Sequence, residues 1–296
     1  GERSADDLHI IYTGGTTGFP KGVMWRHEDF WRTLGGGIDF YTGEKLDEYD
    51  QSKQASQEGR MVTFPLSPLM HGGAQAGLLM HLFAGHLTIL EPKFDAQRTW
   101  EIIDENGVML IFMTGDAMAR PLIEEFERKA ATDAPYSGAS LFAVSSSAAI
   151  FSPEVKERWI EALPNPDYTD SVGGGETGFQ GMGMQDKTHI SSDGPVVGLG
   201  PNSVVLDDDN NVLDLATNVG KVGRLGRGGS VPVGYYKDEK KSAETFLVVD
   251  GMRISVPGDF ARIEEEGRVT LLGRGSNCVN TGGEKVYPEE VEMAIK

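Results

Sequence analysis

Cysteine is nearly absent from the 296-residue sequence, whose only one is Cys278. A single cysteine excludes an internal disulfide framework, and no matched histidine and aspartate accompany it as partners of a nucleophile. We therefore interpret Cys278 as an inert small hydrophobic residue. Long apolar runs are also lacking, because the longest, residues 77–90, is too short to span a bilayer and contains two histidines. Residues 1–10 lack the basic-then-apolar order of a signal peptide, so we expect a cytoplasmic protein without a transmembrane segment.

Positive charge is scarce, since 27 Lys and Arg stand against 45 Asp and Glu and give a formal charge of −18. Nucleic-acid binders need Lys and Arg to replace counterions along the phosphates, and anionic membrane surfaces attract basic segments. The charge therefore argues against both kinds of partner. With 39% hydrophobic and 24% charged residues, the composition is that of a folded soluble protein. The length suffices for one large domain or two ordinary ones.

The first half of the chain alternates strand patterns with helix patterns. Such alternation predicts βαβ units and a parallel sheet. Asp95 is the expected N-cap of one helix, and Ser152 with Pro153 is expected to open another. The predicted strands cover residues 8–12 (a buried strand), 61–64, 86–90, 108–113 and 141–144, and the predicted helices cover residues 25–34, 74–83, 95–105, 116–128 and a stretch from 153.

The second half contains short strand-like pieces separated by acidic and glycine-rich turns, which favours antiparallel hairpins. The pieces are residues 203–208, 221–225, 260–264 and 269–272, and a further helix is predicted from Pro288. The sequence thus predicts an α/β protein with a parallel-sheet βαβ subdomain over residues 1–193. A smaller antiparallel β subdomain follows over residues 194–273, and residues 274–296 form a hinge and the start of another domain.

Glycine is in excess, at 39 of 296 residues or about 13% against an average of roughly 7%. Its most informative cluster is residues 12–22, YTGGTTGFPKG, which follows a predicted strand. Glycines let the backbone approach a polyphosphate and turn its N–H groups toward it. Threonine hydroxyls can ligate Mg²⁺ on the same phosphates, and Lys21 adds a mobile positive charge. The order of residues differs from the common P-loop, because Pro20 precedes the lysine and Gly22 follows it.

This loop resembles the phosphate-binding signature of the adenylate-forming superfamily of acyl-CoA synthetases, luciferases and peptide-synthetase adenylation domains. Further segments resemble the family's other motifs in the family's order. They are PLMHG at 68–72, VSSSAA at 144–149, DSVGGGETG at 170–178, VGYYKDEKKSAETF at 233–246, PGD at 257–259 and LLGRGSNCVNTGGEKVYPEEVE at 271–292. The matches cover nearly all of the chain. The amino-acid sequences of the loop and of residues 114–121 and 234–241 are most similar to those of fatty-acyl and steroid side-chain CoA ligases.

The resemblance implies the adenylate-forming fold and a two-step reaction with ATP, Mg²⁺ and CoA. A carboxylate attacks the α-phosphate of ATP and releases pyrophosphate, and the CoA thiol then displaces AMP from the acyl-adenylate. Such chemistry depends on positioning and charge neutralisation. The implied substrate is a long-chain or steroid-linked acid, because the wording matches that subgroup and because small side chains at residues 73–77 leave volume beside His71.

The resemblance also implies residue roles. Thr16, Glu176 and Lys21 take the catalytic roles, with Thr16 and Glu176 as the Mg²⁺ contacts. Asp259 and Arg274 match the ribose and phosphate contacts, and His71 borders the acyl channel, although a lone histidine is more often a core or capping residue. The implied nucleotide-binding residues are Thr13, Gly14, Gly15, Thr16, Thr17, Gly18, Lys21, Ser146, Ser147, Ala148, Asp170, Gly173, Glu176, Asp259 and Arg274.

Three residues depart from the family pattern. Val172 replaces an aromatic residue that stacks on adenine, Gly175 replaces a Thr or Ser, and Ser276 replaces a hinge Asp or Lys. Two alternatives therefore stay open: a degenerate nucleotide-binding module without catalysis, and an acyl-AMP ligase that serves a carrier protein. We expect the chain to be the middle of a ligase, inactive alone, because the family's opening region and the lysine of its C-terminal domain are not in it. Association through exposed apolar surface is also expected.

Overall fold

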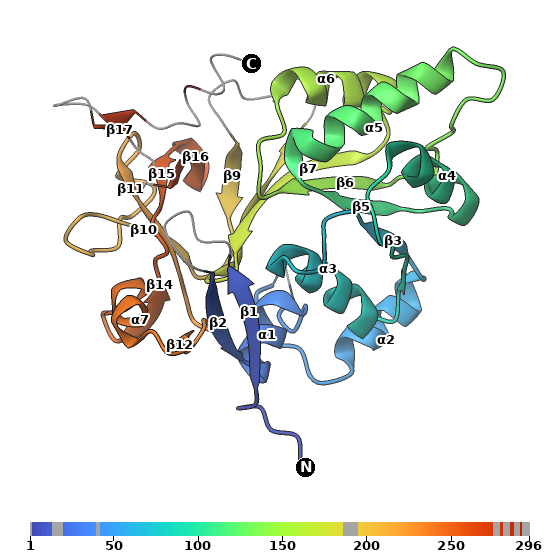
Figure 1. Cartoon of the computed structure of the whole chain (residues 1–296). Helices are drawn as coiled ribbons and strands as arrows, with labels where there is room; N and C mark the ends of the chain where they lie inside the picture. The colour runs from blue at the N-terminus through green and yellow to red at the C-terminus, as the bar shows by residue number, and fades with distance from the viewer. Residues whose placement is uncertain are drawn as a thin grey trace.

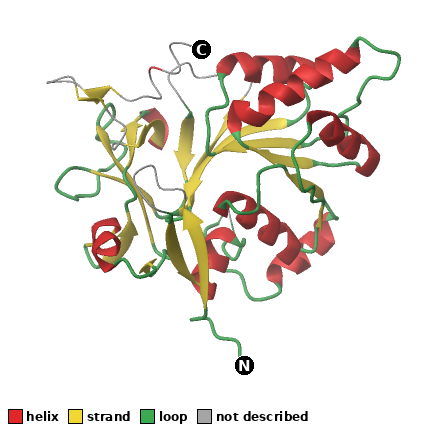
Figure 2. Ribbon diagram, in the orientation of Figure 1, coloured by secondary structure: helices red, strands yellow, loops and turns green. Residues whose placement is uncertain are grey.

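The computed structural model describes residues 2–13, 20–39, 42–185 and 195–274, together with 279–280, 285–286 and 291. These residues form a mixed α/β fold with one large sheet and a small three-stranded sheet (Figure 1). The predicted fold class is confirmed, because parallel strands surrounded by helices lead into a mostly antiparallel half (Figure 2). None of the helices in the described residues is long and apolar enough to cross a membrane.

The parallel part of the large sheet has the strand order β4-β3-β5-β6-β7. Its strands are β3 (Val62–Pro65), β4 (Leu87–Thr88), β5 (Leu110–Met113), β6 (Ala143–Ser147) and β7 (Asp167–Gly174). Four of them fall on predicted strands, displaced or shortened by one to three residues. The fifth, β7, is a strand that the sequence analysis did not predict.

Two helical layers enclose these parallel strands. On one side lie α4 (Ala96–Asn106), α5 (Gly115–Ala130) and α6 (Pro153–Ala162), and α3 (Gly72–Phe83) lies on the opposite side (Figure 1). The first layer is sealed around Trp100 and Trp159, both without exposed surface. Their indole N–H groups donate to the carbonyls of Leu122 and Ala119 on α5, at 2.8 and 2.9 Å. The main core of the molecule therefore lies between α4–α6 and the sheet.

Two of the helices in this layer have N-caps that the sequence predicted. The Asp95 carboxylate accepts the backbone N–H of Arg98 at 2.8 Å, which confirms it as the N-cap of α4. Ser152 and Pro153 open α6 as predicted, with Ser152 at the N-cap and Pro153 at the first helical position, although the Ser152 hydroxyl makes no cap hydrogen bond. The Asp116 carboxylate instead accepts the backbone N–H of Ser152 at 2.8 Å. This contact ties the start of α6 to the neighbouring helix α5.

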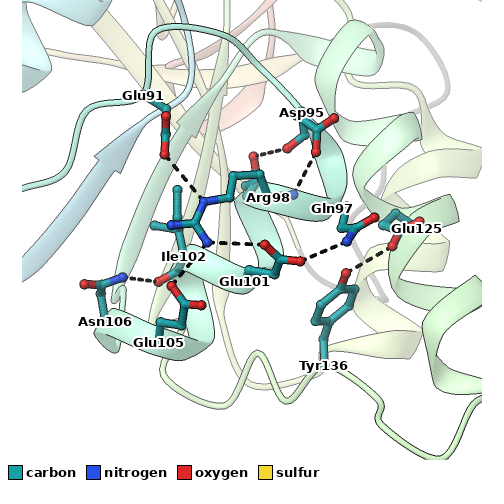
Figure 3. A network of polar contacts seen from close by, with 11 residues as sticks. Glu91, Asp95, Gln97, Arg98, Glu101, Ile102, Glu105, Asn106, Glu125 and Tyr136 are labelled. Atoms are coloured by element: carbon teal, nitrogen blue, oxygen red, sulfur yellow. Dashed lines mark hydrogen bonds and ion pairs between the residues drawn. The ribbon is translucent and has the colours of Figure 1, made fainter.

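The outer surface of α4 carries a network of charges (Figure 3). The Arg98 guanidinium contacts the carboxylates of Glu101 and Glu105 at 3.2 Å each and that of Glu91 at 3.6 Å. The Tyr136 hydroxyl donates to Glu125 at 3.1 Å beside it. The groups around Arg98 are partly exposed and pair with one another, so each pair contributes little to stability, whereas the Glu125 side chain is only 13% exposed.

The antiparallel half continues the same sheet. β7 turns into β8 (Gly178–Gln185), and the order continues through β9, β16, β15, β11, β14 and β13, with β10 on β11. Their bounds are β9 (Val196–Leu199), β10 (Ser203–Leu206), β11 (Val222–Gly228), β13 (Phe246–Val249), β14 (Met252–Ser255), β15 (Asp259–Ile263) and β16 (Arg268–Arg274). The antiparallel hairpins predicted for the second half are confirmed. The predicted boundary at residues 193 and 194 lies outside the described residues, and the division into domains stays a prediction.

A separate sheet joins the start of the chain to a segment of its second half. It consists of β1 (Leu8–Thr13), β2 (Lys21–Arg26) and β12 (Gly234–Tyr235), all antiparallel. The prediction of a buried strand at residues 8–12 is wrong in its burial: Ile11 is buried, but Tyr12 is 64% exposed. The predicted helix at residues 25–34 begins only at His27, because Trp25 points into the core as a residue of β2.

The remaining elements are short. They are α1 (His27–Leu34), α2 (Asp50–Glu58), α7 (Glu239–Thr245), the 3₁₀ turn η1 (Glu265–Gly267), β17 (Val279–Asn280) and β18 (Lys285–Val286). The helix predicted from Pro288 falls outside the described residues, apart from Val291.

His81 on α3 makes the stability of the fold depend on pH. Burial lowers its pKa from 6.5 to about 4, and the nearby His86 acts in the same direction. Below pH 6.5 the unfolded chain therefore binds more protons at this site than the folded chain. We expect the free energy of unfolding to fall by about 3 kcal/mol between pH 6.5 and 4 through this group. Urea titrations across that range should show the decrease in the unmodified chain but not in His81→Leu; equal slopes would contradict the assignment.

Candidate functional site

The turn between β7 and β8 is the point where the predicted site residues meet. A side chain at Gly175 in this turn would come within 2.8 Å of the Thr13 methyl group at the end of β1. A Cβ on Gly72 at the start of α3 would lie 3.8 Å from the Cα of Gly175. A Cβ on Gly73 would lie 4.0 Å from the hydroxyl of Ser147 at the end of β6. The carboxyl ends of parallel strands, where ligands of open α/β sheets bind, thus meet β1 and α3 here.

Both ends of the glycine-rich loop are placed at this turn. Thr13 pairs with Lys21 in the register of β1 and β2, so the loop between them closes a hairpin. The Lys21 ammonium contacts the Asp238 carboxylate at 2.7 Å and lies 5.7 Å from the centre of the Tyr235 ring. The predicted binding residues Gly14, Gly15, Thr16, Thr17 and Gly18 lie outside the described residues.

Three side chains from other elements hold the turn. The Trp25 indole of β2 donates to the carbonyl of Gly175 at 2.8 Å. The buried Arg227 guanidinium of β11 donates to the carbonyl of Thr177 at 3.2 Å, and burial lowers its pKa to about 10. The Tyr235 hydroxyl of β12 donates to Oε1 of Glu176 at 3.0 Å. Each of these contacts fixes one residue of the turn, so the backbone around the Glu176 carboxylate is restrained on both sides.

Glu176 carries a buried carboxylate, with the residue only 5% exposed. Within the described part of the chain, neither an ammonium nor a guanidinium group lies within ion-pair distance of it. Burial and the carboxylate both raise the pKa of Tyr235, so its hydroxyl stays protonated and serves as a donor. A buried carboxylate without a direct cationic partner is costly unless a cation binds it. Its hard oxygens therefore suit a divalent cation that shares a site with phosphates.

Asp259 and Arg274 form an ion pair at the same edge of the site. Nε of Arg274 lies 3.1 Å from Oδ1 of Asp259, across β15 and β16. Burial alone would lower the pKa of Arg274, but the carboxylates of Asp259 and Glu176 outweigh it and raise that pKa. Arg274 thus adds positive charge near Glu176. The structure brings these two predicted ribose-contact residues together, next to Tyr235.

Asp170 on β7 is buried against Lys156 of α6, and the two side chains form an ion pair. Burial raises the pKa of Asp170, and the Lys156 ammonium opposes that shift. Since Lys156 already occupies the Asp170 carboxylate, the contact supports a role in holding β7. Three residues further along, a side chain on Gly173 would collide with the carbonyl of Gly178, so the start of the turn requires glycine.

The end of β6 approaches the turn from the other side. The buried Ser146 hydroxyl accepts the backbone N–H of Gly115 at 3.1 Å, while Ser147 is half-buried toward α3. Ala148 follows with a φ of 65°, in the left-handed region that disfavours side chains. Such local strain marks a tight backbone turn beside the site. His71 directly precedes α3, is exposed, and makes no side-chain cap hydrogen bond.

Comparison with known proteins identifies the family of the chain. The family described as AMP-binding enzyme matches residues 2–236. The chain belongs to the AMP-binding enzyme family. It is 51% identical, over its whole length and 53% of the relative, to the 3-oxocholest-4-en-26-oate–CoA ligase of Rhodococcus rhodochrous. It is 50% identical, again over its whole length and 53% of the relative, to the medium/long-chain-fatty-acid–CoA/3-oxocholest-4-en-26-oate–CoA ligase of Mycobacterium tuberculosis.

Solved structures share the fold of this chain. One is the O-succinylbenzoate coenzyme A synthetase of Bacillus subtilis in complex with ATP and magnesium ion, with a TM-score of 0.75 and 20% identity over 99% of this chain and 55% of that one. Another is ATP-bound MatB from Rhodopseudomonas palustris, with a TM-score of 0.72 and 23% identity over 98% of this chain and 52% of that one. The resemblance to adenylate-forming enzymes is thus confirmed. The chain spans about half the length of the curated relatives it matches.

Four residues at the site of this AMP-binding enzyme were missed by the sequence analysis. They are Trp25, Lys156, Arg227 and Tyr235. Two of them carried a signal: Tyr235 lies in the stretch 233–246 that resembles a family motif, and Lys156 lies on the apolar face of its helix. Trp25 was assigned to a helix, and Arg227 lies between glycines that indicated only a turn.

The structure shows how Val172 and Gly175, two of the three departures from the family pattern, are packed. The space that a side chain at Gly175 would occupy is filled by the Thr13 methyl group. Val172 is half-buried and packs against the core of the antiparallel strands. Both positions are therefore well packed as they stand. Ser276 lies outside the described residues.

Proposed function

We propose that the chain forms the nucleotide-binding part of an ATP-dependent acid–CoA ligase that acts through an acyl-adenylate. The observation that carries the proposal is the buried carboxylate of Glu176, which has no ion-pair partner in the described residues and lies beside the hairpin of Thr13 and Lys21. The relatives at 50% identity support the same reaction, since they are named as acid–CoA ligases. The substrate class is a long-chain or steroid-linked carboxylic acid.

In the proposed reaction, Glu176 and Thr16 would hold Mg²⁺, which would neutralise phosphate charge. Lys21 exchanges its contact with Asp238 for the ATP phosphates, and Asp259 accepts the ribose hydroxyls while Arg274 donates nearby. A substrate carboxylate oxygen attacks the α-phosphorus, and the bond to the pyrophosphate leaving group breaks. The CoA thiolate then attacks the acyl carbon, AMP leaves with the bonding electron pair, and a thioester forms.

The substrate class can be tested by competition in the intact protein, meaning the whole natural polypeptide that contains these residues. We expect a higher kcat/KM for palmitate or 3-oxocholest-4-en-26-oate than for acetate. Each buried methylene contributes about 0.8 kcal/mol, so a large apolar acid gains most from the site. A higher kcat/KM for acetate would contradict the substrate class. Lack of ATP–pyrophosphate exchange with every acid would instead favour the degenerate module without catalysis.

The thiol acceptor is proposed as CoA rather than a carrier protein, on the strength of the relatives' names. Chromatographic detection of acyl-CoA, beside a parallel assay with a phosphopantetheine-loaded carrier protein, separates the two. Thioester formed only on the carrier would overturn the choice. We also propose the cytoplasm as the compartment, because ATP and CoA are supplied there and the chain has a single cysteine. Recovery of the native protein in an oxidising compartment would contradict this.

Self-association of the chain is proposed through β1, an edge strand of the small sheet. Leu8, Ile10 and Tyr12 expose their apolar side chains along it. Exposed apolar edges promote association with other chains. Light scattering of the 296-residue chain should show oligomers that weaken in Ile10→Lys. A monomer at high concentration would contradict the proposal.

The Tyr235 hydroxyl is expected to matter for adenylate formation through its contact with Glu176. Tyr235→Phe removes one hydrogen bond to a charged group, typically about 2 kcal/mol. We expect the rate of ATP–pyrophosphate exchange to fall about tenfold or more in the intact protein. Tyr236→Phe is the matched control, because Tyr236 is the next residue and is 52% exposed. Equal rates for the two variants would contradict the role of Tyr235.

A further inference from the structure

The side of α3 that faces the sheet is lined by very small residues over its first two turns. Ala74, Gly77 and His81 follow one another at spacings of three and four residues on this side, and Gly73 is exposed at the start of the helix. Ala74, Gly77 and His81 are buried, and a Cβ on Gly77 would lie 3.6 Å from the Phe112 ring of β5. His81 is therefore the first side chain longer than a methyl group along this line.

The sheet surface opposite α3 is less tightly covered than the surface opposite α4–α6. Ile111 and Val144 have no exposed surface and point toward the α4–α6 layer. Their strand neighbours Leu110, Phe112 and Ser145 alternate to the α3 side, and all three are only half-buried. The seam between α3 and the sheet, lined by Gly77, Phe112, Ser145 and His81, is therefore less tightly sealed than the core on the other side. The Phe112 ring packs against α3 at Gly77 and would have to turn aside for an apolar ligand to pass.

One end of this seam lies at the proposed adenylation site. At the first turn of α3, Gly72 approaches Gly175 and Gly73 approaches Ser147. From His71 to His81 the helix advances by ten residues, or about 15 Å. An acid whose carboxylate lies at the Gly175 turn would thus extend along the seam toward His81.

His81 has unused hydrogen-bonding capacity at the far end. It is 5% exposed, its ring centre lies 5.6 Å from that of Phe112, and its Nε2 atom has no hydrogen-bond partner in the described part of the chain. The ring of His86 lies 5.5 Å away, and its Nδ1 faces the backbone N–H of Met61 at 3.3 Å. Burial keeps His81 neutral by lowering its pKa to about 4, so one ring nitrogen can donate and the other can accept. Buried polar atoms normally have partners, so this nitrogen indicates a missing one.

We propose that Nε2 of His81 hydrogen-bonds an oxygen at the end of the acid remote from its carboxylate, which makes the seam selective for acids that carry a distal keto or hydroxyl group. This inference rests on the proposed ligase function. The names of the relatives that share half of this sequence support it, since 3-oxocholest-4-en-26-oate has its ketone on the ring farthest from the carboxylate. A plain fatty acid offers no such oxygen and would leave the imidazole unpaired.

The test compares two acids in the intact protein: 3-oxocholest-4-en-26-oate and the same acid without its 3-oxo group. His81→Leu should lower kcat/KM for the keto acid about tenfold, mainly through KM, and leave the deoxy acid unchanged or improved. His81→Gln retains a donor of similar reach and should restore part of the preference. His27→Leu, a change at an exposed histidine on α1, is the control and should alter neither acid.

Each outcome of this test either supports or contradicts the role of His81. An equal loss for both acids, or no loss for the keto acid, would show that His81 only packs and would overturn the inference while the ligase function stands. The Gln variant decides the same question if the Leu variant does not fold. A lack of adenylation with either acid in the unmodified protein would contradict the proposed function itself, and the inference would fall with it.

Discussion

Replacing Glu176 by glutamine is expected to suppress adenylate formation by about a thousandfold in the intact protein, with the fold unchanged. The substitution keeps the shape of the side chain and an oxygen for the Tyr235 hydroxyl, but it removes the charge that would bind Mg²⁺. Charge stabilisation by a metal at a transferring phosphate is typically worth several kcal/mol. Because the carboxylate is buried and lacks a neighbouring cation within ion-pair distance in the described residues, no other group replaces it.

The measurement is ATP–pyrophosphate exchange as a function of Mg²⁺ concentration. We expect the Glu176→Gln variant to need far more Mg²⁺ for any residual rate. Glu266→Gln is a suitable control, since its side chain is 80% exposed at the turn before β16 and forms an ion pair with Arg268. Exchange at the unmodified rate in Glu176→Gln would disprove the metal role. A loss of equal size in Glu266→Gln would indicate an effect of net charge instead.

Most of the parallel strands could be predicted because they lie in or beside short apolar runs. Residues 108–113 illustrate this. A strand that is covered on both faces has apolar side chains at every position, so it is visible in the sequence as a short apolar run between turns. β7 and β8 were missed for the opposite reason. Glycines are depleted in strands, yet Gly181 and Gly183 are needed because a Cβ there would collide with carbonyls of β9. A close approach between backbones cannot be deduced from local pattern.

α2 was missed because its sequence, DQSKQASQE, has no apolar period. Its anchor is polar: the Gln51 amide donates to the carbonyls of Gly35 and Met80 at 2.9 and 3.0 Å. The stability of this helix therefore comes from tertiary hydrogen bonds, which leave no mark in the hydrophobic pattern.

The residues of the candidate site could likewise be predicted only in part. Glu176 and the hairpin of Thr13 and Lys21 could be predicted, because the residue types and their order carry the chemistry. The contact of Tyr235 with Glu176 joins residues 59 positions apart, and that of Arg227 with Thr177 joins residues 50 positions apart. Such pairings depend on how the small sheet and β11 pack against the turn, so only the three-dimensional fold reveals them.

The second large effect is expected from the buried ion pair between Lys156 and Asp170. Both side chains are almost fully buried, at 5% and 9% exposure. Lys156→Met keeps the apolar stem but leaves the Asp170 carboxylate without a cation in the protein interior. Breaking a buried pair on one side typically costs 3–5 kcal/mol, so we expect the free energy of unfolding to drop by about 4 kcal/mol. Urea unfolding of the 296-residue chain measures this directly.

The double variant Lys156→Met/Asp170→Asn is the matched control, because it removes the stranded charge as well. It should recover most of the stability, since replacing both members of a buried pair is often nearly neutral. The pH dependence gives an independent check. Without Lys156 opposing it, burial should raise the folded pKa of Asp170 further, so the folded single variant binds a proton more readily than the unfolded chain. Its deficit should therefore be largest at high pH and shrink as the pH falls toward the ordinary range of an aspartate. A deficit that stays constant with pH, or a double variant no more stable than the single one, would show that Lys156 contributes through packing against Phe151 rather than through its charge.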